Sequence, residues 1–359
     1  MSSNFKSAAI SHGETLRGGN FYRLAVVGAG TLKGKEVADV LNDRNFPSID
    51  VKLLDDDESF GKLEAVGEEV TFIQSVRHEQ FENMDFTFFA SDSESTRRNW
   101  KTARNAGSAI VDLSFALEDE PAAAIRSPWI ERQLGQLWVP ELQPGPAVVA
   151  HPAAVVLALL VLRVQKAGPV KRAVATVFEP ASEHGQKGMD ELHEQTVNLL
   201  SFQQLPKGVF DAQVAFNVVD RYGERSTPPL SAVEDRIQRH FRSIVQGKLN
   251  VPSLMLLQAP IFHGHAFSLY IELDTAAQNE ELVAAVSGEH VDVLQGAEES
   301  PSNVNAAGQE QIQVFVRRDA QNANGFWLWA ATDNLRIAAL SAVECAESMI
   351  ASRPRGTVQ

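Results

Sequence analysis

Apolar runs of strand length alternate with amphipathic segments of helix length from residue 21 onward. Strands are predicted at 24–27, 49–54, 85–90 and 109–112, and helices near 33–43 and 95–106. This alternation is typical of a parallel α/β sheet, in which a helix connects neighbouring strands. It ends near residue 150. We therefore predict one α/β domain over 21–150, preceded by a flexible tail at 1–20.

The second half begins with a helix opened by Pro152, a residue that suits the first helical position because its missing N–H would be unpaired there. Strand-like runs then follow at 172–179, 252–261, 265–273, 311–317 and 325–331, with helices near 186–201, 232–247 and 275–286. This pattern of strands and helices predicts an α+β domain over residues 151–332. Its sheet should be mostly antiparallel and covered on one face by helices, a surface suited to pairing subunits.

Two segments remain at the end of the chain. A last helix at 333–352 is expected to pack back on the first domain. Residues 296–310, which are rich in Glu, Ser, Asn, Ala and Gly, are expected to form a long loop.

Composition narrows the function classes. The formal net charge of −14 argues against nucleic-acid binding, which needs clustered Lys and Arg. No apolar run reaches the roughly 20 residues of a membrane span, and the longest, at 152–162, is expected to be a buried core helix. The single cysteine, Cys345, is expected to be a buried core residue. Because one cysteine cannot form a disulfide within the chain, a cytoplasmic location is favoured. Expected partners are a small molecule or nucleotide and a second copy of the chain.

A glycine turn follows the first predicted strand. Gly28, Gly30, Thr31 and Gly34 lie between that strand and a helix, the context in which backbone N–H groups approach a pyrophosphate. The second strand ends at Asp55, about 20 residues past the last glycine, where a carboxylate accepts hydrogen bonds from ribose hydroxyls. Acidic residues follow Asp55 directly and would repel a 2′-phosphate. NAD is therefore possible as a cofactor, and NADP is less favoured.

Six short motifs occur in an order that resembles the aspartate-semialdehyde dehydrogenase family, including its cysteine-less paralogues. They are the turn at 28–34, Val139-Pro140-Glu141, the GMDEL and EQT runs within 188–196, Ala215-Phe216-Asn217-Val218, the run from Pro260 to His265, and Asp333-Asn334-Leu335-Arg336. The resemblance implies a Rossmann-type domain and a second domain that carries catalysis and dimerisation. It also implies NADP-dependent reductive dephosphorylation of an acyl phosphate through a thioester on cysteine.

The positions that carry this chemistry in the family are changed here. Ala154 stands where the family has its cysteine, and a methyl group cannot be a nucleophile. Glu179 replaces a glutamine, and Glu118 and Gln258 replace the arginines that hold phosphate and substrate carboxylate. A lysine of the family falls near Glu234 or Asp235. Of the chemical residues, His265 remains, either as an acid–base group or as a structural histidine.

The cofactor side also departs from the family. The loop that recognises the NADP 2′-phosphate aligns with Asp56, Asp57 and Glu58, and Lys33 replaces a small apolar residue in the turn. NADP binding of the family type is therefore less favoured than NAD binding.

Two hypotheses follow. The chain is a dimeric pseudoenzyme that binds a nucleotide or acts as a scaffold without acyl-phosphate reduction. Alternatively, it is an NAD(P)-dependent oxidoreductase of amino-acid biosynthesis with altered chemistry or substrate, using some of His265, Glu179, His184, Ser182 and His151. Spacing alone does not pair Ser182 with His184. His263 and His265 share a strand face but lack a third ligand, so no metal is predicted.

Overall fold

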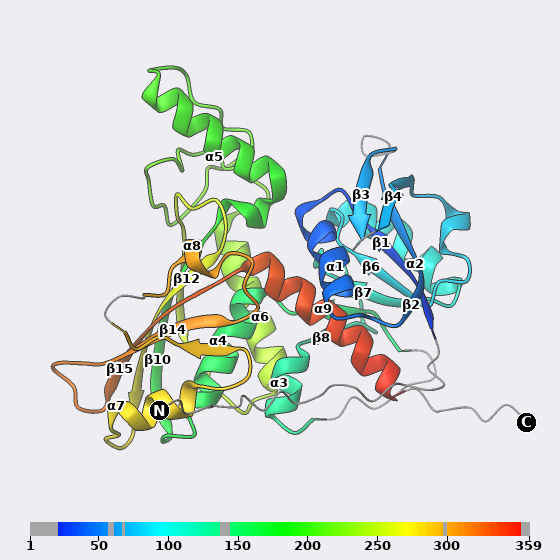
Figure 1. Ribbon diagram of the computed structural model, residues 1–359. Coiled ribbons are helices and arrows are strands. Elements are labelled where there is room, and N and C mark those ends of the chain that lie inside the picture. The colour runs from blue at the N-terminus through cyan, green and yellow to red at the C-terminus, as the bar shows by residue number, and fades with distance from the viewer. Residues whose placement is uncertain (1–20, 57–60, 67–68, 137–143, 297–299, 353–359) are drawn as a thin grey trace, which may run out of the picture.

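The computed structural model describes residues 21–56, 61–66, 69–136, 144–296 and 300–352 (Figure 1). Two β-sheets dominate it, and the helix α9 (Asn334–Ser352) runs between them and along the first. Both predicted classes are confirmed: a parallel α/β sheet comes first in the chain, and a mixed sheet packed against helices follows.

The first sheet has seven strands in the order β5-β2-β1-β6-β7-β9-β8, and all its pairs are parallel. The strands are β1 (Tyr22–Val27), β2 (Ser48–Asp55), β5 (Gln74–Ser75), β6 (Phe86–Phe89), β7 (Ala109–Asp112), β8 (Ala124–Arg126) and β9 (Ala147–Val149). The chain leaves β1 for β2 on one side and later returns to β6 on the other. Ligands of such sheets bind at the carboxyl ends of the strands beside this reversal, so β1 and β6 define where a site is expected.

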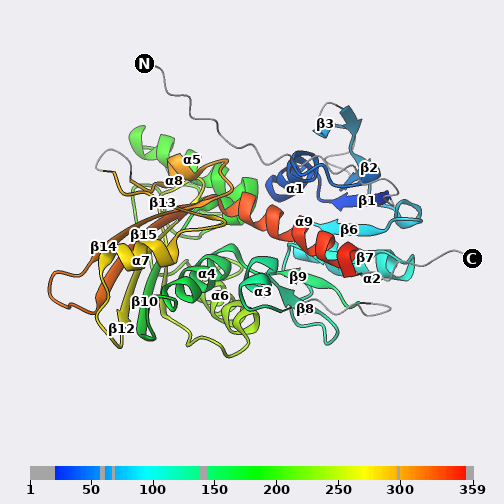
Figure 2. The ribbon, with the colours of Figure 1, turned by 60° about the horizontal axis from the view of Figure 1, so that its bottom comes forward.

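The second sheet has six strands in the order β11-β10-β12-β15-β14-β13. They are β10 (Val170–Glu179), β11 (Ser253–Gln258), β12 (His265–Leu273), β13 (Val291–Val293), β14 (Ile312–Arg318) and β15 (Gly325–Thr332). The central pairs are antiparallel, and the two outer pairs are parallel. The helices α4 (Pro152–Val164), α6 (Leu230–Val245) and α7 (Asn279–Val286) lie on one face (Figure 2). The prediction that α4 is a buried core helix is confirmed, since nearly all its side chains are buried.

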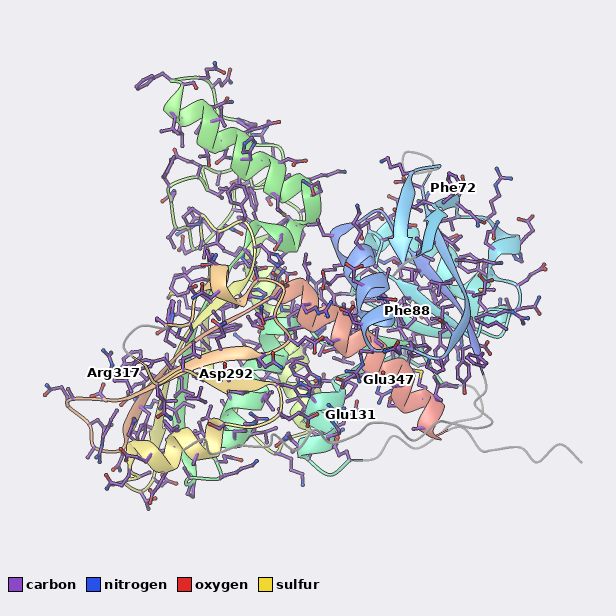
Figure 3. The ribbon with its side chains drawn as sticks, viewed as in Figure 1. Phe72, Phe88, Glu131, Asp292, Arg317 and Glu347 are labelled. Carbon is purple, nitrogen blue, oxygen red and sulfur yellow. The ribbon has the colours of Figure 1, made fainter. Side chains whose placement is uncertain are left out.

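The helix α9 packs against α1 (Leu32–Asp43) of the first sheet. Ion pairs flank this contact: Arg336 of α9 meets Glu36 and Asp43 of α1, and Arg44 meets Glu347. Glu347 is labelled on α9 in Figure 3, and Phe88 marks the interior of the first sheet. Glu36 and Asp43 lie on the same face of α1, about two turns apart, so Arg336 contacts α1 at two separate points.

Several short elements differ from the sequence expectations. The predicted loop at 296–310 contains the short helix α8 (Asn303–Ala306), capped by the Ser302 side chain. The predicted strand at 252–261 ends earlier, at Gln258, and Pro260, which has no N–H to donate, follows. Elements not predicted are β3 (Leu63–Val66), β4 (Glu69–Phe72), β5, β8, β9, β13, the short 3-10 helices η1 (His78–Phe81) and η2 (Ala181–His184), and α3 (Pro128–Gln133). Most span too few residues to show a period.

The remaining helices are α2 (Ser93–Asn105) and α5 (Gly185–Leu200), and both were predicted within a few residues. In the parts of the chain that the structure describes, none of the helices combines the length and the apolar character that crossing a membrane requires.

Candidate functional site

The glycine turn joins β1 to α1 at the carboxyl end of the first sheet. Gly28 has a φ of +86°, and a Cβ there would lie 2.4 Å from the backbone nitrogen of Ser91. A Cβ on Gly34 would lie 2.0 Å from the carbonyl oxygen of Gly28. Both positions therefore require glycine, one for the turn itself and one for the close approach of α1.

Thr31 caps α1. Its Oγ1 accepts a hydrogen bond from Gly34 N at 3.0 Å and lies 2.8 Å from the carbonyl oxygen of Gly28. The first two helical N–H groups, those of Leu32 and Lys33, have no partner within an α-helix. They face the end of the helix where a phosphate would bind.

Asp55, expected to meet a ribose, also braces the glycine turn. Its Oδ2 accepts a hydrogen bond from Gly30 N at 2.6 Å, and its Oδ1 accepts one from Asp56 N at 2.9 Å. Burial raises the pKa of Asp55, and these two hydrogen bonds oppose the rise. Asp57 and Glu58, which the sequence analysis aligned with the 2′-phosphate loop, lie outside the described residues, as does the motif at 139–141.

The position predicted to have lost a nucleophile lies in the first turn of α4. Ala154 is buried and donates its N–H to the carbonyl oxygen of His151 at 2.9 Å. His151 caps the helix, since its Nδ1 accepts a hydrogen bond from Ala153 N at 3.2 Å. Burial holds the pKa of His151 well below its ordinary value, so the ring is neutral at pH 7 and carries its proton on Nε2.

His265 and Glu179 meet beneath this turn. Glu179 ends β10 and His265 begins β12, two antiparallel neighbours, and His265 Nε2 lies 2.9 Å from Glu179 Oε2. Both side chains are buried. Burial raises the pKa of Glu179, and the hydrogen bond from His265 opposes the rise. His265 Nδ1 is buried with no hydrogen-bond partner among the described residues.

Glu183, in η2, lies close to both His151 and Glu179. Its Oε1 accepts a hydrogen bond from Asn334 Nδ2 at 2.7 Å, and its Oε2 lies 3.6 Å from Lys33 Nζ. Burial opposes ionisation of Glu183, yet the positive charge of Lys33 and the Asn334 hydrogen bond help to hold its pKa well below the ordinary range. Lys33 Nζ also lies 4.9 Å from the centre of the Phe115 ring.

His151, Glu179 and Glu183 each offer an atom within 4.8 Å of the others, the spacing of a metal site. The hydrogen bonds and the proton of His151 oppose metal binding here. A lone pair of His151 is already taken by Ala153 N–H, and its other ring nitrogen carries the proton, so no nitrogen is left to bind a cation. The carboxylates are likewise engaged by His265 and Lys33.

Glu118 lies in a cluster of cations that the sequence analysis missed. Its carboxylate accepts hydrogen bonds from Arg236, with Nε 3.0 Å from Oε2, and from His240, with Nε2 also 3.0 Å from Oε2, and it pairs with Arg239. Burial would raise the pKa of Glu118, but these partners outweigh it and lower the pKa to about 2. Glu118, which was predicted to replace a phosphate-binding arginine of the family, is thus itself neutralised by two arginines.

The spacing of Arg236 and Arg239 in the sequence could have predicted that they lie together. Arg236, Arg239 and His240 are spaced three and four residues apart on α6, so they share one face of the helix. The sequence analysis placed the family's lysine at Glu234 or Asp235 instead. Glu234 accepts a hydrogen bond from Leu256 N at 2.7 Å, and Asp235 is exposed. The next residue, Arg236, is the one that meets Glu118.

His240 connects this cluster to His151. His240 Nδ1 accepts a hydrogen bond from the backbone N–H of His151 at 2.9 Å, so the neutral ring carries its proton on Nε2 and donates it to Glu118. The ring of Phe115 stacks on that of His151, with centres 5.5 Å apart. One continuous network thus runs from α6 to the start of α4.

Gln258 is buried at the end of β11 and fully engaged. Its Oε1 accepts a hydrogen bond from Tyr222 OH at 2.7 Å, and its Nε2 donates to the carbonyl oxygens of Glu179 and Ala259. A neutral amide that is satisfied in this way offers no positive charge to a substrate carboxylate. His184 belongs to the same group, 3.0 Å from Tyr222 OH, and burial lowers the pKa of His184 to about 4.

The structure pairs Ser182 with His263 rather than with His184. Ser182 Oγ lies 3.3 Å from His263 Nδ1 and 3.2 Å from Asn334 Oδ1, and it is completely buried. His263 Nε2 lies 2.7 Å from Asp333 Oδ2. His263 and His265 therefore face different carboxylates, so the two rings do not form a shared metal site.

Two family models match this chain. The NAD-binding domain of semialdehyde dehydrogenases matches residues 23–147, and the dimerisation domain of semialdehyde dehydrogenases matches residues 161–337. The chain belongs to the semialdehyde dehydrogenase family. The glycine turn, Asp55 and Glu118 lie in the range of the first model, and Glu179, Arg236, Gln258 and His265 lie in that of the second.

Individual relatives agree with this membership. The chain is 29% identical over 340 residues to an aspartate-semialdehyde dehydrogenase of Rickettsia bellii, covering 92% of this chain and 98% of the relative. It is 30% identical over 334 residues to a USG-1 protein homolog of Pseudomonas aeruginosa, covering 91% and 97%. A solved structure of a probable aspartate-semialdehyde dehydrogenase from Pseudomonas aeruginosa superposes with a TM-score of 0.81 at 26% identity, covering 92% of this chain and 99% of that one.

Proposed function

We propose that this semialdehyde dehydrogenase homologue is a homodimeric, nucleotide-binding pseudoenzyme that does not reduce acyl phosphates through a cysteine thioester. The observation that carries the proposal is the start of α4, where the family mechanism needs a thiolate and this chain has the buried methyl group of Ala154. The single cysteine of the sequence, Cys345, is buried in α9, and burial raises its pKa to about 12. It therefore supplies no thiolate at neutral pH.

The surrounding charges support the same proposal. Glu118 forms ion pairs with Arg236 and Arg239. The side chain of Gln258 is hydrogen-bonded to its neighbours. The polar groups of this region therefore already have partners within the protein. An incoming phosphate would have to displace Glu118 from the arginines. An incoming carboxylate would find a neutral amide at Gln258.

The glycine turn fits a dinucleotide. Gly28 and Gly34 allow a tight turn that a Cβ at either position would prevent, and the N–H groups of Leu32 and Lys33 at the start of α1 suit a pyrophosphate. Asp55 lies at the end of β2, where a carboxylate meets the ribose hydroxyls of NAD. The nicotinamide ring, when bound, accepts or donates a hydride. We infer that NAD is preferred over NADP, because Asp55 and the exposed Asp56 oppose a 2′-phosphate.

An activity assay tests the proposal. The purified protein is incubated with aspartate β-semialdehyde, phosphate and either NAD or NADP, and absorbance at 340 nm is followed, with an active family member as the positive control. We expect no turnover from the wild type. We also expect none from Ala154→Cys, because Glu118 still occupies the arginines. Appreciable turnover from the wild type would refute the proposal, and turnover from Ala154→Cys alone would refute the description of the pocket.

A second function is favoured by one observation, the buried pair of His265 and Glu179. A histidine 2.9 Å from a carboxylate whose pKa is raised is an arrangement that can move a proton. We therefore retain an altered oxidoreductase as the alternative. Reduction of NAD in the presence of small aldehydes by the wild type, lost on His265→Gln, would favour this alternative over the pseudoenzyme.

The open face of the second sheet supports the homodimer. Val174 of β10, Met255 of β11 and Trp327 of β15 are exposed on the face opposite α4, and Met255 is 55% exposed. Tyr270 lies between Val174 and Trp327 in the strand register, with its ring 5.0 Å from that of Trp327. Apolar side chains gathered on one sheet face suit an identical face on a second copy.

We expect the wild type to sediment as a dimer and Met255→Glu to shift it towards monomer, because the new charge would be buried at the contact. Val304→Glu, which changes another exposed apolar residue outside the sheet, is the matched control. A wild type that is monomeric at all concentrations would contradict the assignment.

A further inference from the structure

Lys33 makes a contact that the glycine turn does not require. It is the second residue of α1, and its side chain leaves the turn to meet Glu183 of the dimerisation domain, with Nζ 3.6 Å from Oε2. The Lys33 side chain is 17% exposed and that of Glu183 is 6% exposed. The ammonium group is also held over the Phe115 ring. A lysine at a helix start would ordinarily extend into water.

The pair joins two facing elements of the first and second domains, which we call the two walls. One wall is the start of α1, where a pyrophosphate would bind, and the other is η2, which carries Glu183. In Figure 1, α1 and the lower end of α5, which follows η2, face each other across the two halves of the molecule, and α1 and α5 are in contact. A dinucleotide bound at the glycine turn must extend its other end between these walls to reach Glu179 and His265.

Glu183 is positioned firmly. Asn334 donates to Glu183 Oε1, while Asn334 Oδ1 accepts hydrogen bonds from Gly264 N at 3.1 Å and from Ser182 Oγ. The carboxylate is therefore fixed by the backbone and side chains of its own domain. Lys33, with four rotatable bonds, is the movable partner.

We propose that the Lys33–Glu183 ion pair is an internal barrier between the two walls, so that NAD binds only in molecules in which the pair is open. The inference rests on the proposed nucleotide-binding function. A ligand that binds one conformation has its affinity reduced by the fraction of molecules in that conformation. With the pair formed, Lys33 blocks the path between the walls. With it broken, Lys33 is free to meet a phosphate.

The test measures NAD affinity of the full chain by isothermal titration calorimetry. Glu183→Gln keeps the size of the side chain and an acceptor for Asn334 but removes the charge that holds Lys33. We expect its dissociation constant for NAD to fall about tenfold, or binding to become measurable where the wild type shows none. Lys33→Met/Glu183→Gln removes both charges and should also bind more tightly than the wild type, because no ion pair can then join the two walls.

Matched controls change the same charges elsewhere. Lys35→Met removes a positive charge from an exposed position of the same helix, and Glu194→Gln removes a negative charge from an exposed position of α5. Both should bind NAD within about twofold of the wild type. Circular dichroism and thermal unfolding establish that each variant is folded, and the double variant keeps the test valid if Glu183→Gln alone does not fold.

Two results would overturn the barrier. If Glu183→Gln and the double variant bind NAD no more tightly than the wild type, the pair does not control access. If Lys33→Met alone binds more weakly while Glu183→Gln is unchanged, Lys33 is an ordinary phosphate ligand. These results are independent of the proposed lack of turnover, since that claim fails only if the wild type oxidises aspartate β-semialdehyde.

Discussion

Replacing Glu118 by glutamine tests the charge network beside Ala154. At pH 7 the folded protein holds an ionised Glu118 between Arg236, Arg239 and His240. Lowering its pKa from 4.5 to about 2 favours the folded state by about 3 kcal/mol, at about 1.4 kcal/mol for each tenfold change in proton affinity. Solvent around the partly exposed arginines screens part of this, so we expect Glu118→Gln to cost about 2 kcal/mol.

The pH dependence gives the sharper test. Because the folded pKa lies below the ordinary value, the stabilisation is complete well above pH 4.5 and is lost as the pH falls towards 2. We expect the stability gap between wild type and Glu118→Gln to shrink by about 0.5 kcal/mol at pH 4 and by more than half at pH 3. Other carboxyls that titrate in this range, such as Asp333, are present in both proteins and cancel in the difference.

The assay is urea unfolding at several pH values, followed by tryptophan fluorescence. Asp119→Asn is the control, because Asp119 also meets Arg239 but is exposed, and its loss should cost no more than about 0.5 kcal/mol. A stability gap for Glu118→Gln that stays constant from pH 7 to pH 3 would refute the reasoning. So would a variant as stable as the wild type at pH 7.

Two further predictions follow from burial and backbone geometry. Gly28→Ala should destabilise the protein by more than about 1 kcal/mol and abolish nucleotide binding, because the position has a positive φ and its Cβ would overlap the backbone of Ser91; a variant with wild-type melting temperature would contradict this. Cys345 should react with a thiol reagent such as DTNB only after unfolding in denaturant, because it is fully buried with a raised pKa, and rapid labelling of the native protein would show that α9 opens.

Local patterns predicted much of the fold. The parallel sheet, the helix α1 and the glycine turn follow from periodicity and from residues adjacent in the sequence, as Gly28 and Gly34 illustrate. Strands of three residues such as β9 carry too little pattern to be detected. Long-range pairing was also out of reach: the meeting of Ser182 with His263, not with His184 two residues away, depends on how η2 packs beside the start of β12.

The candidate site shows the same limit. The sequence singled out Glu118 but did not bring Arg236 to it, because these residues are 118 positions apart and meet only through the packing of α6. Likewise, Asp55 was predicted from its spacing to the glycines, whereas its hydrogen bond to Gly30 N follows from the tightness of the turn. Spacing predicts which residue types occur near a site, and packing decides how their charges are paired.

The contact of α9 with α1 has a consequence for the order of folding. The helix α9 follows both sheets in the chain, so the strands and helices of the first sheet leave the ribosome well before the helix that covers α1. Until then the apolar side of α1 and the neighbouring strands remain open to water or to a chaperone. Removing α9 from the C-terminal end should therefore destabilise the N-terminal domain.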